Sequence, residues 1–567
     1  MVRKHVSASQ IMPVKPETRD MHPYLTLHDP ARAAAYYAGG LWQSDTFYGL
    51  LSRHAEARPE ALALRDGRHQ LTWGQLREWV DGVAAELRTY GLAGGDRMAI
   101  WMSNRAEAIV SFLACSREGI ACNPSLHRTY TCREVGILLE RLSCRALLTE
   151  SGWGADRDRA NFDAVLSGVS SIKVVFTPQL FPRPGPNRMP PCDTPDKVTY
   201  LAFTSGTTGA PKCVMHSDNT LLANARDLVR DWGHGPETVM MSLSPLSHHI
   251  AWVAVAQWLL TGCRLVTDDP PAGISQLDWI IQTEATYLLG VPTHAIDVLA
   301  ALDASGQPKL GSVKLFYMAG SAIAPSLAES LVQRGITPQN VYGMTENSSH
   351  QYTHPLDDPE IIVTTCGRGG RAYEICLFDP SDPDRPVPQG EVGEIGGRGA
   401  ALMLGYFDNQ GATERSFNRD GWFLSGDLGV VDEHGNLQVR GRLKEVIIRG
   451  GRNIYPAHIE NAAARHVGVE AAICFPIADD RLGERVCIAI IGNVSATQLL
   501  EHLATEGLSK YDMPEFFVRV TSYPLTASGK VLRRSLVEMV RRRELVPEPL
   551  RIIRYSVSQR SSAEQVH

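Results

Sequence analysis

The chain has 567 residues, of which 44% are hydrophobic and 21% charged, so its length allows several globular domains. Its net charge of −6 offers no basic surface field, and we expect no nucleic-acid partner. The eleven cysteines form no Cys-x-x-Cys pair, which favours reduced thiols over disulfides or a zinc site. We find neither a secretory signal pattern nor an apolar stretch of membrane-span length, and therefore expect a cytoplasmic protein without a membrane span.

Polar, proline-punctuated residues open the chain, and we expect residues 1–25 to form a loose N-terminal arm and residues 26–441 a large domain. Helical spacing of apolar side chains predicts a first amphipathic helix, followed by a strand over 96–101 and a helix over 106–114. This alternation predicts an α/β fold, with a mostly parallel sheet flanked by helices on both faces. The apolar residues of the first helix are Leu76, Trp79, Val83 and Leu87.

Residues 203–212 carry the strongest functional signal. An apolar run over 199–203 predicts a buried strand that leads into a loop rich in glycine and hydroxyl side chains. Glycines let backbone N–H groups approach an anion, hydroxyls add donors, and Lys212 adds a positive charge. Neither the Walker pattern nor the dinucleotide pattern is present. The alternative is a surface linker, but the lysine and the preceding strand favour a nucleotide-phosphate site.

Later segments carry weaker signals when each is taken alone. Glu346 in the segment Tyr-Gly-Met-Thr-Glu could be a surface acid, although a carboxylate beside a phosphate site suits Mg²⁺. Asp427 ends a turn and could bind ribose hydroxyls or merely close the turn. Lys530 lies on a glycine-flanked loop near the C-terminus, where most lysines are solvated.

The composition changes twice in the second half of the chain. A proline-rich break over 379–390 precedes a glycine-rich region, in which we expect a β-rich subdomain. After Gly441 a small α+β pattern begins, and we expect a C-terminal domain over 442–545 and a flexible tail over 546–567. The expected elements of this domain are strands over 445–449, 471–476 and 486–491 and a helix over 456–465.

In this order and spacing the motifs resemble the adenylate-forming enzymes: acyl- and aryl-CoA ligases, stand-alone adenylation domains and firefly-type luciferases. The resemblance covers about residues 46–540 and implies an acyl-CoA synthetase with a mobile C-terminal lid joined near Lys444. ATP, Mg²⁺, CoA and a small carboxylic acid are the implied cofactors and substrates. The acid would attack the α-phosphate of ATP to give acyl-AMP and pyrophosphate, and a thiol would then displace AMP. Residues 34–42 and 481–485 resemble the branch for short- or medium-chain and alicyclic acids, such as cyclohexanecarboxylate–CoA ligase.

The resemblance also implies roles for single residues. Thr345 would contact the α-phosphate, Glu346 would hold Mg²⁺, and Lys530 would touch both the carboxylate and the α-phosphate. His248 matches the acyl-pocket histidine of the family, with a core histidine as the alternative. Tyr342 would stack on adenine, and Gly450 and Gly451 would line a pantetheine tunnel. The expected ATP- and CoA-binding residues are Thr204, Ser205, Gly206, Thr207, Thr208, Gly209, Lys212, Gly320, Ser321, Ala322, Tyr342, Gly343, Asp427, Arg442, Lys444, Gly450 and Gly451.

Two positions depart from the family pattern, and two alternatives stay open. Cys213 stands where glycine is usual, and Ser425 replaces a threonine while keeping the hydroxyl. An acyl carrier protein could replace free CoA as the thiol, although no carboxylate follows His248 to pair the ammonium of an amino acid. A non-catalytic nucleotide-binding regulator is the other alternative, and the presence of Lys530 disfavours it. The candidates for the acyl pocket are Trp252, Gly290, Gly320, Gly343, Asn347 and His350.

Overall fold

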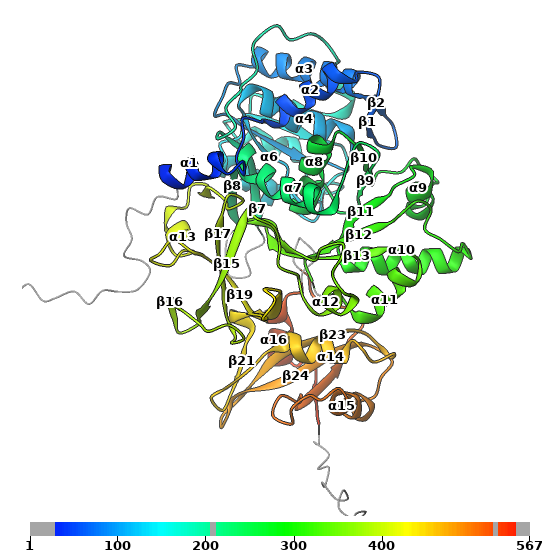
Figure 1. The fold of residues 1–567 in the computed structure, drawn as a ribbon, viewed down its shortest axis with the longest axis vertical. Helices are drawn as coiled ribbons and strands as arrows, with labels where there is room; N and C mark the ends of the chain where they lie inside the picture. Colours follow the sequence, from blue (N-terminus) through cyan, green and yellow to red (C-terminus); the bar gives the residue numbers. More distant parts are fainter. Residues whose placement is uncertain (1–28, 205–210, 322, 526–530, 551–567) are drawn as a thin grey trace, which may run out of the picture.

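The computed structural model describes residues 29–204, 211–321, 323–525 and 531–550. Figure 1 shows two adjacent α/β layers and an antiparallel sheet in the larger part, and a separate sheet with its helices at the C-terminal end. The expected fold class is thus confirmed: a large α/β domain with a β-rich part and a small α+β domain. The exact domain limits stay predictions. No helix among the described residues is long and apolar enough to cross a membrane.

The first sheet has the strand order β18-β8-β7-β4-β3-β5-β6 and carries the strand expected before the phosphate loop. Its strands β7, β4, β3, β5 and β6 are parallel, whereas β8 and β18 complete one edge in antiparallel orientation. The strands are β3 (Arg97–Trp101), β4 (Ala121–Asn123), β5 (Ala146–Thr149), β6 (Val174–Phe176), β7 (Val198–Thr204), β8 (Lys212–Ser217) and β18 (Gly405–Tyr406).

Helices of the N-terminal third cover this sheet and confirm the helical spacing. The predicted amphipathic helix is α3, and the helix expected over 106–114 extends to Glu118, where Gly119 at φ +71° ends it. The described helices and 3₁₀ turn of this region are α1 (Pro30–Ala38), α2 (Phe47–Ala57), α3 (Trp73–Thr89), α4 (Ala106–Glu118), α5 (Cys132–Arg141), α6 (Phe162–Ser167), η2 (Pro178–Leu180) and α7 (Asp218–Trp232).

The second sheet has eight strands in the order β14-β13-β12-β11-β9-β10-β1-β2. It is parallel from β13 to β1 and antiparallel at both edges, so the carboxyl ends of β9, β11, β12 and β13 meet along one side. Ligands bind at such an edge in open α/β sheets. The strands are β1 (Leu62–Arg65), β2 (Gln70–Thr72), β9 (Val239–Ser242), β10 (Arg264–Thr267), β11 (Tyr287–Gly290), β12 (Leu315–Ala319), β13 (Thr337–Met344) and β14 (Ser348–Tyr352).

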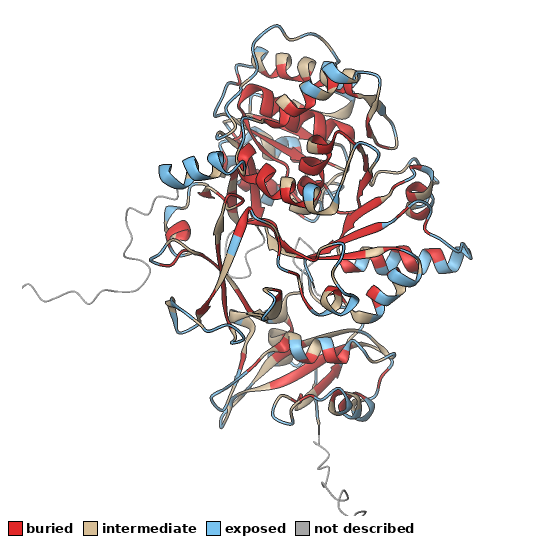
Figure 2. Ribbon diagram, in the orientation of Figure 1, coloured by how far each residue is buried: buried red, intermediate tan, exposed pale blue. Residues whose placement is uncertain are grey.

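Helix α8 lies between these two sheets and is buried almost throughout. It contacts α2 and α7 on one side and β9, β10 and β11 on the other. A helix that is apolar on all faces belongs in a protein interior, and its first turn therefore brings polar side chains to a buried place. In Figure 2 the buried residues concentrate in the strands and inner helices, whereas α1 and α10 are largely exposed. The helices beside the second sheet are α8 (His249–Thr261), α9 (Gln276–Gln282), α10 (Pro292–Ser305), α11 (Pro325–Gln333) and α12 (Pro359–Thr364).

The third sheet is antiparallel, in the order β16-β15-β17-β19-β20, and forms the expected β-rich part. Its last strand leads directly into the C-terminal domain. Its elements are β15 (Tyr373–Asp379), β16 (Asp382–Pro386), β17 (Gly393–Gly399), α13 (Gln410–Glu414), β19 (Phe423–Val431) and β20 (Leu437–Arg442).

The C-terminal sheet has its own apolar core and confirms three of the four elements expected there. The strand predicted over 445–449 is shorter than expected, because Leu443–Glu445 forms a 3₁₀ turn in which Glu445 pairs with Arg533. The elements are η3 (Leu443–Glu445), β21 (Ile447–Arg449), β22 (Arg452–Ile454), α14 (Pro456–Ala463), β23 (Val469–Asp479), β24 (Gly483–Gly492), α15 (Ala496–Thr505), β25 (Phe516–Arg519), α16 (Arg533–Arg541) and β26 (Glu548–Pro549).

Candidate functional site

The predicted phosphate loop connects two paired strands, which hold its two ends side by side. Strands β7 and β8 pair antiparallel, with Thr204 opposite Lys212 and Phe203 opposite Cys213. The Cys213 side chain is fully buried in the core of the first sheet, so the departure from glycine fits the fold. Five predicted loop residues lie outside the described part of the chain: Ser205, Gly206, Thr207, Thr208 and Gly209.

Lys212 and Glu346 approach each other through a third residue that the sequence analysis did not identify. The Lys212 ammonium donates a hydrogen bond to the Tyr406 hydroxyl at 2.7 Å and lies 4.1 Å from the centre of its ring. The Tyr406 hydroxyl in turn donates to Oε1 of the buried Glu346 at 2.9 Å. The expected phosphate and Mg²⁺ residues therefore lie at one place.

Further positive charge lies near Lys212. Burial lowers the pKa of Lys212; Glu346 opposes this shift, while the nearby charges of Lys444 and Arg415 reinforce it. Such a cluster of cations beside one buried carboxylate suits a polyphosphate that arrives with a divalent metal ion.

Tyr342, Asp427 and Arg442 form a second connected group. The Tyr342 hydroxyl donates to Asp427 at 2.9 Å, and Arg442 approaches the other carboxylate oxygen at 3.3 Å. Pairing of β19 with β20 sets Asp427 opposite Arg442, and the Ser425 hydroxyl accepts from the Asp427 N–H at 3.1 Å. The serine that replaces the usual threonine thus holds the aspartate in its turn.

The carboxyl ends of β12 and β13 supply the remaining nucleotide candidates. Gly320 follows β12 at φ +91° and is exposed together with Ser321, whereas Ala322 lies outside the described residues. At Gly343 a Cβ atom would lie 1.7 Å from the Ser348 carbonyl oxygen, so only glycine fits there. The pairing of β13 with β14 is irregular between Tyr342 and Met344, and Thr345 and Glu346 follow in the turn that joins the two strands.

A buried histidine fixes the backbone of Thr345. The His216 Nε2 atom lies 2.6 Å from the Thr345 carbonyl oxygen, which can only accept, so Nε2 carries the proton. The other ring nitrogen contacts the Thr220 hydroxyl at 3.0 Å. Burial lowers the pKa of His216 to about 4, and the ring is therefore neutral at pH 7. Sequence reasoning missed this residue because its partner is 129 positions away.

The two adjacent histidines at the start of α8 have different surroundings. His248 is the N-cap residue, and its ring lies 4.7 Å from that of His127. His249 is buried between the Tyr200 hydroxyl at 3.3 Å and the Ser348 hydroxyl at 3.0 Å. Burial lowers its pKa to about 3, so the ring is neutral. The histidine doublet was the available sequence signal for His249.

Most of the acyl-pocket candidates have structural partners. Trp252 packs against Phe112 in the core and donates to the Leu246 carbonyl. These contacts indicate that Trp252 packs in the core and does not line an acyl pocket. Asn347 bonds to the Met344 N–H and to the Tyr373 hydroxyl, and a Cβ on Gly290 would meet the His294 ring at 2.7 Å.

His350 differs from the other candidates. It is 1% exposed, and neither of its ring nitrogens has a hydrogen-bond partner in the part of the chain that the structure describes. Its ring lies against those of Tyr342 and Tyr373. Burial lowers the pKa of His350 to about 3, so the ring is neutral at pH 7.

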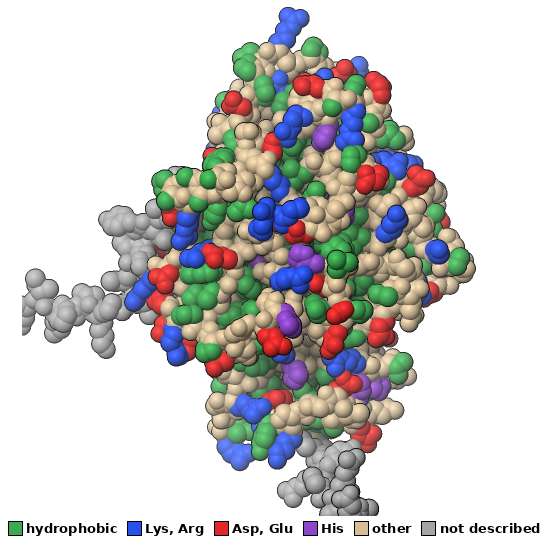
Figure 3. Space-filling view, in the orientation of Figure 1, with side chains coloured by type: hydrophobic (Ala, Val, Ile, Leu, Met, Phe, Trp, Pro, Cys, Tyr) green, Lys and Arg blue, Asp and Glu red, His purple; other side chains and the backbone are tan. Residues whose placement is uncertain are grey.

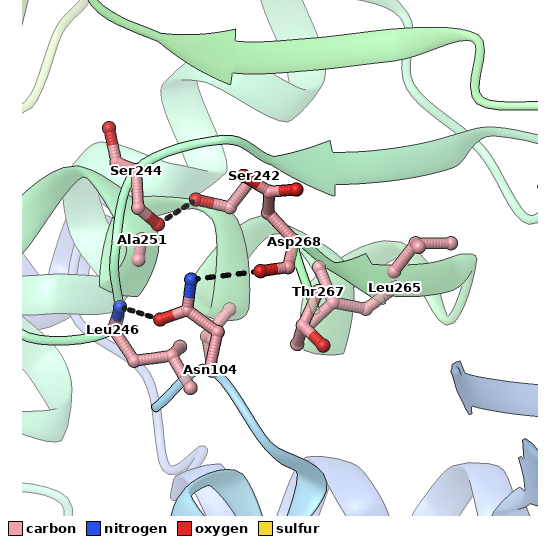
Figure 4. Close-up of a pocket in the computed structure, with 10 residues that line it drawn as sticks. Asn104, Ser242, Ser244, Leu246, Ala251, Leu265, Thr267 and Asp268 are labelled. Atoms are coloured by element: carbon pink, nitrogen blue, oxygen red, sulfur yellow. Dashed lines mark hydrogen bonds between the residues drawn. The ribbon is translucent and has the colours of Figure 1, made fainter. Parts of the chain in front are cut away.

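A small cavity under the first turn of α8 lies among residues that position this helix. Asn104 accepts from the Leu246 N–H at 2.8 Å and donates to the Asp268 carbonyl, and it thereby ties the segment before His248 to two other loops (Figure 4). The cavity of about 10 Å³ holds at most one water molecule, so it is no acyl pocket.

A larger surface cleft of about 480 Å³ lies beside the end of α7. Figure 3 shows histidine and basic side chains along the middle of this face of the molecule. Within the cleft, however, Arg230 pairs with Asp227 and Asp231, and Arg368 pairs with Asp357. This balance of charge makes the cleft a weak anion site.

The C-terminal candidates that the structure describes lie on turns with exposed side chains or backbone. Gly450 and Gly451 form the two-residue turn of the β21–β22 hairpin, at φ +58° and +84°. Positive φ at both positions matches a type I′ turn. The turn therefore requires the two glycines whether or not a pantetheine arm passes here. Lys444 lies in the exposed 3₁₀ turn before β21, and Lys530 lies outside the described residues.

Comparisons with known proteins agree with this geometry. The AMP-binding enzyme family matches residues 51–407, and the AMP-binding enzyme C-terminal domain matches residues 458–530. The medium-chain fatty-acid–CoA ligase of Escherichia coli (strain K12) is 29% identical, over 92% of this chain and 95% of that enzyme. A salicylyl-CoA synthase/salicylate adenylyltransferase from a Streptomyces species is 30% identical, over 90% and 97%. ATP-bound MatB from Rhodopseudomonas palustris has a TM-score of 0.77 at 25% identity, over 87% and 99%.

The chain belongs to the AMP-binding enzymes, within the acyl-CoA ligases of the adenylate-forming superfamily. The expected activity, ATP-dependent ligation of a carboxylic acid to CoA through an acyl-adenylate, is confirmed at this level.

Proposed function

We propose that this enzyme uses Mg²⁺-ATP to activate a carboxylic acid that lacks an α-ammonium group, and that it transfers the acyl group to free CoA. One observation carries the nucleotide part of the proposal: Lys212 and Glu346 meet through Tyr406, beside the further cations Lys444 and Arg415. A carboxylate and a triphosphate repel each other, so positive charge must hold both while pyrophosphate leaves.

In the first half-reaction a carboxylate oxygen attacks the α-phosphorus and pyrophosphate departs. The phosphate loop and Lys212 bind the β- and γ-phosphates, Tyr342 stacks on adenine, and Asp427 accepts the ribose hydroxyls. Thr345, whose carbonyl His216 holds, presents its hydroxyl to the α-phosphate. Lys530 neutralises charge between the two reacting groups.

Mg²⁺ fits the donor set at Glu346, because this buried carboxylate is a hard oxygen ligand beside the phosphate site. Glu346 would hold the ion together with phosphate oxygens, and the ion would neutralise phosphate charge.

In the second half-reaction the CoA sulfur attacks the acyl carbonyl carbon and AMP leaves with the C–O bonding pair. The open space around Gly451 supports passage of a pantetheine arm, since no atom of the described residues lies within 4 Å of a Cβ placed there. We expect the enzyme in the cytoplasm, because all eleven cysteines are free thiols.

The acid class follows from the start of α8. The first turn of α8 contains no acidic residue. It begins with the neutral His249, which lies between the Tyr200 and Ser348 hydroxyls. An ammonium group would find no counter-charge there, whereas an uncharged acyl group meets rings and hydroxyls.

A panel of acids without amino groups and matched α-amino acids tests the proposal by AMP release. CoA and a phosphopantetheine-bearing carrier protein serve as alternative acceptors. We expect activity with plain acids and CoA. Activity confined to amino acids, or to the carrier protein, would contradict the proposed acid class or acceptor.

A further inference from the structure

A short segment physically connects the end of the phosphate loop to Glu346. The Met403 N–H donates to the Glu346 carbonyl at 2.8 Å, and the Phe407 N–H donates to the Cys213 carbonyl at 2.7 Å. Between them Tyr406 pairs with Val214 as part of β18. The backbone of this segment therefore sets the separation of the two elements that bear Lys212 and Glu346.

The Tyr406 ring is held firmly in this segment. It is 3% exposed and packs in a small core with Val214, Met403 and Phe423, among others. A tyrosine phenol keeps its proton at neutral pH, and the hydroxyl here lies between the Lys212 ammonium at 2.7 Å and Oε1 of Glu346 at 2.9 Å. A protonated phenol accepts from the lysine and donates to the carboxylate at the same time.

We propose that Tyr406 is a positioning residue that keeps the Lys212 ammonium and the Glu346 carboxylate apart and aligned for Mg²⁺-ATP. The inference rests on the proposed use of Lys212 for phosphate and of Glu346 for Mg²⁺. Among the described residues no ion pair within 4.0 Å joins the two directly; the phenol hydroxyl stands between them.

Separation matters because a half-buried lysine and a buried carboxylate attract each other strongly. Without the hydroxyl, the two side chains would be free to form a direct pair. Mg²⁺ and phosphate would then have to break that pair before they bind, and affinity for the metal–nucleotide complex would fall. Tyr406 thus sets the charges of the site before the ligand arrives, as pre-organised sites require.

The test uses the full chain and needs no acid substrate, so it is independent of the reaction that the enzyme catalyses. Tyr406→Phe removes one hydroxyl and keeps the ring that fills the core. We expect its affinity for Mg²⁺-ATP, measured by titration calorimetry, to fall on the order of tenfold or more, the usual effect of losing hydrogen bonds to charged groups. Affinity for ATP without Mg²⁺ should fall less, because Glu346 then has no metal to bind.

Tyr287→Phe is the matched control. Its hydroxyl is also buried and bonds to Gln339 at 3.0 Å, but it lies at the amino end of β11, away from the site. The control should bind Mg²⁺-ATP like the wild type. Equal affinities of Tyr406→Phe and wild type would overturn the inference, and so would an equal loss in both phenylalanine variants or an equal loss with and without Mg²⁺. Failure of the wild type to bind Mg²⁺-ATP would instead overturn the proposed function.

Discussion

The two parts of the molecule hold their functional residues in opposite ways. In the large domain, Glu346 and Asp427 are buried, and hydrogen bonds from Tyr406 and Tyr342 fix them. In the C-terminal domain, Gly450 and Gly451 lie on an exposed turn outside the apolar core. We infer that the first part pre-organises the groups that must keep one geometry. We propose that the second part delivers groups needed in one step only.

Lys530→Ala should show this difference with the largest effect. If Lys530 bridges carboxylate and α-phosphate only during adenylation, its loss removes charge stabilisation from that transition state alone. We expect acyl-AMP formation to fall by about a hundredfold or more, the scale of losing one transition-state donor. Pyrophosphate exchange measures this step. An unchanged exchange rate would remove Lys530 from catalysis.

Glu346→Gln should weaken Mg²⁺ use at the pre-organised site, with a smaller effect than the Lys530 variant. The change keeps the shape of the side chain but removes the charge that would bind Mg²⁺. We expect a roughly tenfold rise in the Mg²⁺ concentration needed for half-maximal adenylation, since one charged ligand is lost. A magnesium titration of the exchange rate measures it, and the same half-saturation as in the wild type would exclude Glu346 from the metal site.

Gly451→Leu should affect the other half-reaction. A bulky side chain in the open space at this turn would obstruct a pantetheine arm, so thioester formation should slow by about tenfold while adenylation is kept. The positive φ of Gly451 adds strain, and the control Gly507→Leu meets the same strain at φ +80°, also with open space around it. Equal slowing of both half-reactions, or equal effects in the two variants, would assign Gly451 to the turn alone.

The last expected effect is on stability and not on rate: the two domains should differ in acid stability. Burial lowers the pKa of His127, His249 and His350 to about 3 and that of His216 to about 4. Because these histidines take up protons near pH 6.5 only when unfolded, their contribution is complete above that pH and is lost as the pH falls. For each of these histidines, the free energy of unfolding of the large domain should fall by about 1 kcal/mol per pH unit below about pH 6.

Scanning calorimetry at about pH 7.5 and pH 5.5 brackets this range and measures the effect. Between about pH 7.5 and about pH 5.5 the unfolding temperature of the large domain should fall more than that of the C-terminal domain. His350→Gln should reduce the shift, whereas His434→Gln, at an exposed histidine, should not. A shift unaffected by His350→Gln would contradict the assignment to buried rings.

The sequence predicted what depends on local pattern. Helix α3 and strand β7 follow from apolar spacing, and Lys212, Glu346 and Asp427 were identified from motifs whose residues adjoin in the chain. In the structure Lys212 connects to Glu346 through Tyr406, and Asp427 bonds to Tyr342, which lies four residues before Glu346. Their individual catalytic roles stay predictions.

Contacts between distant segments were the part that pattern could not reveal. Tyr406 contacts Lys212 across 194 positions, and His216 contacts Thr345 across 129. Neither residue lies in a segment with a phosphate or metal signature, because each acts through a neighbour in space. The predicted length of strand β21 was too great for a similar reason. The pair of Glu445 with Arg533 joins segments far apart in the sequence, which local pattern could not reveal.

The central claim is that a fixed site and a delivered lysine divide the two half-reactions. Rapid-quench measurement of both steps in the Lys530→Ala variant tests it most directly, with ATP and acid for the first step and preformed acyl-AMP and CoA for the second. The account predicts a loss of about a hundredfold or more in acyl-AMP formation and nearly unchanged thioester formation. Equal losses in both steps would contradict it.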